Sequence, residues 1–180
     1  AQYFHALRRQ KKKEFAKPLI LMAPKSLLRH KSCVSELKEL TKGRFEEFLP
    51  DPVPATRTDT LVLCSGKVYY DLIEAREAIR TPKASIIRVE QFYPFNKEKF
   101  AKTIEPYAKA KKVVWCQEEP ENMGAWPFLA PLLEDCLGRK PVYVGRTATA
   151  SPATGSLTLH KKEQASLVAD ALGIPSKEDS

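Results

Sequence analysis

Five short apolar runs along the chain have the composition of β-strands. They are rich in β-branched and aromatic residues, and they are bounded by proline, glycine or charged residues. Most are continuously apolar rather than alternating, which indicates strands covered on both faces by helices, as in parallel sheets. The predicted strands are residues 18–23, 60–65, 84–90, 112–117 and 141–146.

Four segments between and after these strands have helical patterns, because apolar residues recur at three- and four-residue spacing. Arg76 falls on the apolar stripe of the first, and we expect its charged end to extend toward solvent at the edge. We expect Pro106 to kink or divide the second, and Gly138 and Gly173 to cap the third and fourth. The predicted helices are residues 69–80, 97–110, 123–138 and 160–173.

The alternation of strands and helices predicts an α/β protein with a mostly parallel open sheet. Residues 41–59 are proline-rich and polar, and they predict an irregular connection over the surface. A length of 180 residues suits a single domain. No apolar run approaches the roughly 20 residues that cross a bilayer, so we expect a soluble intracellular protein without a membrane partner.

Positive charge is concentrated at one end of the chain. Residues 1–44 hold 12 Lys and Arg against 3 acids, whereas the remainder holds 18 basic and 19 acidic residues. A basic patch can bind nucleic acid by releasing counterions, but no stacking aromatics are interleaved and no nucleic-acid motif occurs. We therefore expect no nucleic-acid partner, and favour a solvated helix face or a surface that docks on an acidic neighbour.

The four cysteines form no CxxC pair, which argues against a zinc site and against a disulfide framework. Two of them lie inside predicted strands. Buried free thiols in a reducing compartment are the favoured interpretation. The cysteines are Cys33, Cys64, Cys116 and Cys136.

The segment 113–126, VVWCQEEPENMGAW, offers a candidate acid/base pair in Glu118 and Glu119. Adjacent residues of an extended chain point to opposite sides, so the two carboxylates cannot both flank one bond. We expect both to serve the structure. No HExxH or GxSxG motif accompanies the histidines, so we expect each to lie at the surface or to be hydrogen-bonded. They are His5, His30 and His160.

Residues 64–72, CSGKVYYDL, predict a strand, a Ser-Gly turn and the start of a helix. Such a turn exposes helix amides to anions, and Lys67 adds a cation. The phosphate-loop and GxGxxG motifs are absent, however, so a plain tight turn is favoured over an intrinsic nucleotide site.

Six blocks follow one another over nearly the whole chain: YFHALRRQ, APKSLLRHKS, CSGKVYYDL, RVEQFYPF, WCQEEPENMGAW and YVGRTATASPATGSLTLHKKEQ. Together they resemble the C-terminal domain of the 2-oxoglutarate dehydrogenase family. The resemblance implies a transketolase-like domain over residues 1–173, a three-layer sandwich whose five-stranded sheet is mostly parallel with one antiparallel edge strand. We expect residues 141–146 to form that edge strand, residues 1–17 a basic lead-in helix, and residues 174–180 a flexible tail.

The resemblance also implies the chemistry of a parent enzyme. Thiamine diphosphate, held with Mg²⁺, attacks the keto carbon of 2-oxoglutarate, CO₂ leaves, and the succinyl group passes to a lipoyl arm. The GDG…N signature of the cofactor domains does not occur here. We therefore expect no catalytic, cofactor-binding or metal-binding residue in this chain, and no activity from it alone. The implied partners are a second parent chain in a homodimer, the lipoyl-bearing succinyltransferase and dihydrolipoyl dehydrogenase.

An assembly and regulatory role is implied for this domain, since actinobacterial relatives bind acetyl-CoA at its strand-end loops. Basic and amide side chains at predicted strand ends suit phosphate and adenine, which makes an acetyl-CoA or AMP effector site a hypothesis. Its candidate residues are Lys67, Arg88, Gln117 and Arg146.

Two alternatives stay open: a paralogue that acts on 2-oxoadipate or decarboxylates 2-oxoglutarate, and a free-standing module that binds acyl-CoA or a nucleotide. The start at Ala1, without methionine and on a helical pattern, suggests an excised piece and speaks against the free-standing module. The Trp126-Pro127 version of the motif favours bacterial cytoplasm over a mitochondrial matrix.

Overall fold

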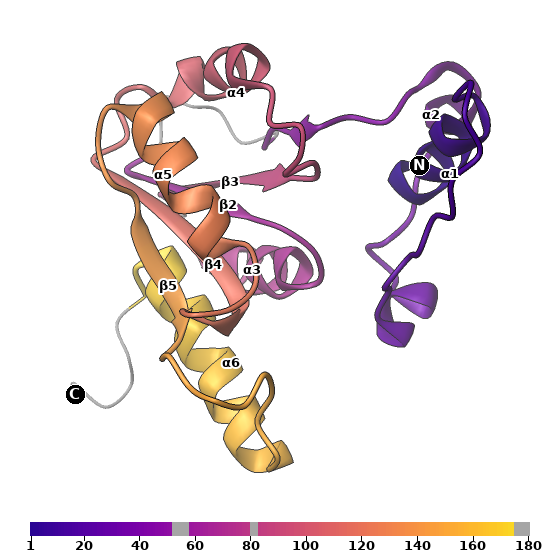
Figure 1. The fold of residues 1–180 in the computed structure, drawn as a ribbon. Helices are drawn as coiled ribbons and strands as arrows, with labels where there is room; N and C mark the ends of the chain where they lie inside the picture. The colour runs from indigo at the N-terminus through magenta and orange to yellow at the C-terminus, as the bar shows by residue number, and fades with distance from the viewer. Residues whose placement is uncertain (52–57, 80–82, 175–180) are drawn as a thin grey trace. The chain divides into compact units, whose positions relative to one another are not determined.

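The computed structural model describes residues 1–51, 58–79 and 83–174 (Figure 1). It divides into two compact units, Ala1–Glu47 and Phe48–Ser180. The helices of the first unit are α1 (Gln2–Lys11), the 3₁₀-helix η1 (Lys25–Arg29) and α2 (Leu37–Lys42).

The first unit is held together by polar contacts of its initial helix. His5 on α1 is buried, and its Nε2 donates to the carbonyl oxygen of Glu39 on α2 at 2.8 Å. The side chain of Gln2 donates to the carbonyl of Glu46 at 2.7 Å and accepts from the same residue's N–H at 2.9 Å. The predicted basic helix is therefore present and ends at Lys11.

The strand predicted over residues 18–23 is wrong, since these residues form neither helix nor strand. Their apolar composition suits a strand, but a strand exists only when its backbone is hydrogen-bonded to a neighbour. Across the described ranges, no backbone–backbone hydrogen bond reaches residues 18–23. Composition alone thus misplaced one of the five predicted strands.

The second unit contains a five-stranded sheet in the order β1-β3-β2-β4-β5. The central pairs β2–β3 and β2–β4 are parallel, as is β4–β5, and only β1 runs antiparallel, against β3. The strands are β1 (Phe48–Leu49), β2 (Thr60–Cys64), β3 (Ala84–Val89), β4 (Lys112–Pro120) and β5 (Val142–Arg146).

One antiparallel edge strand was expected and is present, but its predicted identity is wrong. Residues 141–146 become β5, which is parallel to β4 because the intervening helix α5 returns the chain to the same end of the sheet. The antiparallel strand is β1, inside the segment 41–59 that was expected to be irregular. A strand of two residues is too short to show a hydrophobic period, so the sequence offered no signal for β1.

Helices cover both faces of this sheet, as predicted (Figure 1). Pro106 lies just beyond the end of α4, in η3, and Gly138 and Gly173 end α5 and α6 with φ of 65° and 67°. The helices are α3 (Val68–Glu77), α4 (Lys97–Ile104), η3 (Glu105–Tyr107), α5 (Trp126–Leu137) and α6 (Leu157–Leu172).

Alternate residues of β4 build the two hydrophobic cores of the sandwich. Val113 and Trp115 face the core formed with α4 and α5, whereas Val114 and Cys116 face the core formed with α3 and α6. Both faces of the strand are therefore apolar, which is why its sequence is continuous rather than alternating. The predicted three-layer α/β sandwich is confirmed.

Arg76 was predicted to extend toward solvent, and this prediction is wrong. Arg76 is only 7% exposed, and its guanidinium pairs with the carboxylate of Asp51, which also accepts from the backbone N–H of Ile86. The hydroxyl of Tyr107 donates to the carbonyl oxygen of Asp51 at 3.1 Å. This buried pair connects the end of the β1 segment to α3, β3 and η3.

The four cysteines are free, as expected, but their burial differs. Cys64 and Cys116 are buried on neighbouring strands, and Cys136 is partly buried. Cys33 is exposed, so the prediction of burial is wrong for that residue.

Candidate functional site

The carboxyl ends of β2, β4 and β5 meet at one edge of the sheet. The register places Cys64 opposite Cys116, and Cys116 opposite Val144. A turn at Gly66, with φ of 75°, leads from β2 into α3 and puts Lys67 at the N-cap of that helix. Side chains that follow these strands are thereby brought together with the beginnings of α3 and α6.

Lys67 is held between two carboxylates. Its Nζ lies 2.7 Å from Oδ2 of Asp71, one helical turn on, and 3.1 Å from Oε1 of Glu118 at the end of β4. Burial opposes the charge on Lys67, but the hydrogen bond that Lys67 donates to Asp71 and the nearby carboxylate of Glu118 outweigh it and raise the pKa of Lys67. The lysine is therefore a fixed cation, already partnered on two sides.

Arg146 at the end of β5 makes contacts with β4 and α6. Its Nε lies 2.7 Å from the carboxylate of Glu163, and a terminal nitrogen donates to the carbonyl oxygen of Glu118. The other terminal nitrogen lies 3.2 Å from Oε1 of Gln164 and 3.2 Å from Nδ1 of His160. Every nitrogen of the guanidinium thus has a partner.

Gln164 joins these two clusters, since its Nε2 donates to Oδ2 of Asp71 at 2.7 Å. Thr154 donates to Glu163 at 2.6 Å, and this hydrogen bond, with that from Arg146, lowers the pKa of Glu163. We call the whole set the strand-end network. Its members are Lys67, Asp71, Glu118, Arg146, Thr154, His160, Glu163 and Gln164.

Arg88 lies on the same face of the sheet but outside the hydrogen bonds of the strand-end network. It stands two residues after Ile86 on β3, and its guanidinium stacks 4.5 Å from the ring centre of Tyr69 on α3. Its Nε lies 3.3 Å from the carboxylate of Glu90, and a terminal nitrogen lies 3.5 Å from the hydroxyl of Tyr70. The Arg88 guanidinium is therefore held at its edge by Glu90 and Tyr70 and on its face by the ring of Tyr69.

Gln117 points to the opposite side of the sheet and is 3% exposed. Its Oε1 accepts from the indole of Trp115 at 2.9 Å and from the N–H of Trp126 at 3.0 Å. Its Nε2 donates to the carbonyl of Met123 at 2.8 Å. A Cβ on Gly124, where φ is 66°, would lie 2.9 Å from this amide, so the turn needs glycine. The amide fixes the turn and offers nothing to solvent.

The prediction for the two adjacent glutamates is confirmed in its geometry. Glu118 faces Lys67, whereas Glu119 lies on the side of Gln117 and is exposed. The histidine prediction also holds, because His160 contacts Arg146, His30 accepts from the N–H of Ser32 at 3.2 Å, and His5 is bonded to α2.

Of the four candidate residues, the structure connects Lys67 and Arg146, places Arg88 beside them on the same face, and separates Gln117. Sequence reasoning missed the polar residues between the first two. Asp71 had a signal, since it lies one helical turn after Lys67. Gln164 had none, because 93 residues separate it from Asp71 and only the packing of α6 on α3 brings them together.

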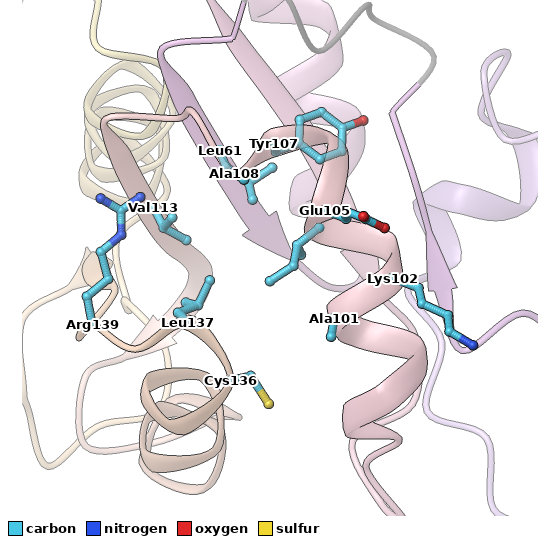
Figure 2. Close-up of a pocket in the computed structure, with 11 residues that line it drawn as sticks. Leu61, Ala101, Lys102, Glu105, Tyr107, Ala108, Val113, Cys136, Leu137 and Arg139 are labelled. Carbon is cyan, nitrogen blue, oxygen red and sulfur yellow. The ribbon is translucent and has the colours of Figure 1, made fainter.

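A second feature is a cavity of about 500 Å³ between α4–η3 and α5 (Figure 2). Leu61 and Val113, near the beginnings of β2 and β4, line it, so it lies away from the strand-end network. Arg139 at its rim donates to the carbonyl oxygens of Ala110 and Lys111 at 2.6 and 3.0 Å. The Arg139 guanidinium therefore connects the segment after α5 to the residues just before β4.

Two classes of site are not found in the part of the chain that the structure describes. No group of three or more His, Cys, Asp and Glu side chains is arranged to hold a metal ion. Nor is any of the described helices long and apolar enough to cross a membrane.

Comparison with known proteins gives one family. The model of the 2-oxoglutarate dehydrogenase C-terminal family matches residues 34–172. The 2-oxoglutarate dehydrogenase E1 component of Rickettsia prowazekii is 49% identical over 185 residues, covering 96% of this chain and 19% of the relative. That of Haemophilus influenzae is 47% identical, covering 97% and 19%.

The chain spans about a fifth of the length of these relatives. A chain from the inactive β4 tetramer of a split-gene transketolase is similar among solved structures, with 18% identity, a TM-score of 0.48 and coverage of 74% of this chain and 44% of the other. The family assignment rests on the sequence relatives and on the extent of the family match. The chain belongs to the 2-oxoglutarate dehydrogenase C-terminal family.

Proposed function

We propose that this chain is the C-terminal assembly and regulatory domain of a 2-oxoglutarate dehydrogenase E1 component. The parent enzyme decarboxylates 2-oxoglutarate and transfers the succinyl group to a lipoyl-bearing second component of the tricarboxylic acid cycle complex. The observation that carries this proposal is identity of 47–49% to E1 components over nearly the whole chain. Its partners are a second E1 chain, the succinyltransferase and dihydrolipoyl dehydrogenase, in bacterial cytoplasm.

The residues present do not fit thiamine diphosphate or its Mg²⁺. A diphosphate-bound Mg²⁺ takes oxygen ligands, carboxylates among them, and in the described residues no group of three or more His, Cys, Asp and Glu side chains is arranged to hold a metal ion. Glu118 and Asp71, two acids of the strand-end network, share the single positive charge of Lys67. We therefore assign the cofactor and the reacting carbon to the rest of the E1 polypeptide, and derive no catalytic step from this domain.

The strand-end network supports an assembly role. Its charges are paired with each other, so it needs no ligand to be stable, and it joins β4, β5, α3 and α6 into one rigid edge. Such an edge is suited to supporting neighbouring domains of a larger enzyme.

We also propose an effector site for acetyl-CoA or AMP at this edge of the sheet. An acetyl-CoA or AMP phosphate can approach Arg88, which among the described residues is paired with the carboxylate of Glu90 and contacts Tyr69 and Tyr70. At Lys67 the phosphate must compete with Asp71 and Glu118. Arg146 contributes as a support, since its nitrogens are occupied. Gln117 is buried on the other face and can act only by shaping the turn.

A paralogue acting on 2-oxoadipate, or a 2-oxoglutarate decarboxylase, carries the same domain, and substrate choice is tested on the intact enzyme. Purified full-length E1 with thiamine diphosphate and Mg²⁺ is expected to release CO₂ from 2-oxoglutarate at a higher kcat/KM than from 2-oxoadipate. The 180-residue chain alone, assayed in parallel, is expected to release none. Turnover by this chain alone contradicts the assignment of chemistry to other domains.

The effector proposal is tested by titrating intact E1 with acetyl-CoA and with AMP in a calorimeter. Replacing Arg88 by alanine is expected to weaken binding by roughly tenfold, the contribution of one charge-assisted hydrogen bond. The matched control is Lys140→Ala, which removes a charge from an exposed position before β5. Lack of binding at millimolar ligand rejects the effector site and leaves the family assignment intact.

A further inference from the structure

The segment Pro18–Ala23, PLILMA, is the most exposed apolar run of the first unit. Ile20 is 81% exposed and Met22 is 92% exposed, whereas Leu19 and Leu21 are 43% and 37% exposed. The alternation has the two-residue period of an extended strand with one face partly covered and the other open. We name the open face, Ile20 and Met22, the uncovered face.

The backbone of this segment is also unpaired within the described ranges. None of the backbone–backbone hydrogen bonds there involves residues 18–23. Prolines stand at both ends, Pro18 and Pro24, which is typical of the limits of a strand, because proline cannot continue a ladder of hydrogen bonds. Five consecutive residues with strand composition, free amides and an open apolar face form an edge that pairs readily with another strand.

Two comparisons indicate where its partner lies. The C-terminal family match begins at residue 34, so this segment lies outside it, while the relatives match 96–97% of the chain. The segment is therefore shared with E1 components but precedes their C-terminal domain. The sheet of the second unit is assembled from five strands without it.

We propose that residues 19–23 are a β-strand that pairs with a sheet in the part of the E1 polypeptide outside these 180 residues, with Ile20 and Met22 buried against it. This rests on the proposed function, because it takes the chain to be part of an E1 component. The occupant is a strand of the same enzyme, which supplies backbone partners for the free amides and an apolar surface for the uncovered face.

The test uses intact E1 with p-benzoyl-phenylalanine in place of Met22, photolysed and mapped by mass spectrometry. Cross-links to peptides outside these 180 residues are expected. The matched control places the same group at Leu28, which is 79% exposed but lies in η1, and should give no such cross-links. Cross-links to β5, to the same segment of a second copy, or to added phosphatidylglycerol vesicles each overturn the proposal.

Hydrogen exchange of unmodified E1 gives a second readout that does not depend on a variant folding. The amides of residues 19–23 are expected to exchange at least about 100-fold more slowly than those of the exposed residues 14–16. Equal exchange in both segments overturns the proposal. CO₂ release from 2-oxoglutarate is measured on the same sample. If the enzyme is active but the amides of residues 19–23 are unprotected, only this inference is rejected. If the enzyme is inactive but these amides are protected, only the proposed function is rejected.

Discussion

The amide of Gln117 satisfies groups that have no access to water. Replacing it by leucine leaves the indole N–H of Trp115 and the N–H of Trp126 without their acceptor in a buried site. Each unsatisfied buried group costs about 1–3 kcal/mol, so we expect Gln117→Leu to lower the free energy of unfolding by about 2–6 kcal/mol. Urea unfolding measures this. Glu119→Gln, at the exposed position two residues on, should change it by less than about 0.5 kcal/mol.

The Cys116 thiol gives a pH dependence. Burial raises its pKa from an ordinary value near 9 to about 12, with a further contribution from Glu118. Between these values the unfolded chain has lost the thiol proton and the folded chain has kept it. The free energy of unfolding therefore falls as pH rises above about 9, by about 1.4 kcal/mol per pH unit for this group.

Urea unfolding between pH 8 and 10.5 checks this dependence, with Cys116→Ala as the control that removes the titrating group. The slope of stability against pH should be less steep in the variant. Equal slopes would show that the thiol ionises as readily in the folded chain as in the unfolded one.

At the scale of the elements, glycines decide where two helices end. Gly138 closes α5 with φ of 65°, and a Cβ at this position would meet no other residue within 4 Å apart from its own chain neighbours and helix backbone. An alanine there meets no neighbour, so its cost is conformational alone, about 1–2 kcal/mol. Gly155 also has open space but no positive φ, so Gly155→Ala should be neutral within about 0.5 kcal/mol. Thermal unfolding of both variants tests the difference, and equal effects contradict it.

The elements also show how far local patterns reach. The strands β2, β3 and β4 are mostly buried, and they were predicted from continuous apolar runs, because burial on both faces leaves a dense apolar signature. β5, which is only partly buried, was predicted from its β-branched and aromatic residues, and the four main helices from apolar residues at three- and four-residue spacing. The wrong strand, residues 18–23, has that signature too, which is consistent with a segment made for burial. The missed strand, β1, is two residues long and has no period to detect.

At the scale of the whole molecule, the Asp51–Arg76 pair connects parts of the chain that are distant in sequence. Replacing Asp51 by alanine leaves the guanidinium of Arg76 buried without its carboxylate, which is expected to cost about 3–5 kcal/mol. Asp59→Ala is the matched control, since Asp59 pairs with exposed Lys83 and Lys111 and should cost less than about 1 kcal/mol. Urea unfolding of the two variants measures both costs, and equal losses contradict a buried pair.

The candidate site depended on the whole molecule in the same way. Lys67 and Arg146 were predicted at strand ends because parallel strands deliver such residues to one edge. That they share a network through Asp71 and Gln164 follows from the packing of α6 on α3. Gln117 was placed at the correct strand end, but the sheet has two faces, and only the described structure shows that its amide turns away from Arg88.

The four main helices, the strands β2 to β5, the α/β class and the family were determined by the sequence alone, because apolar patterns and block similarity are local and survive without coordinates. Strand order, the direction of the edge strands, the pairing of Arg76 with Asp51 and the closure of the strand-end network were decided by tertiary structure. The physical reason is that hydrogen bonds and ion pairs form between groups that are near in space but can be distant along the chain: 25 residues separate Arg76 from Asp51, and 93 separate Gln164 from Asp71.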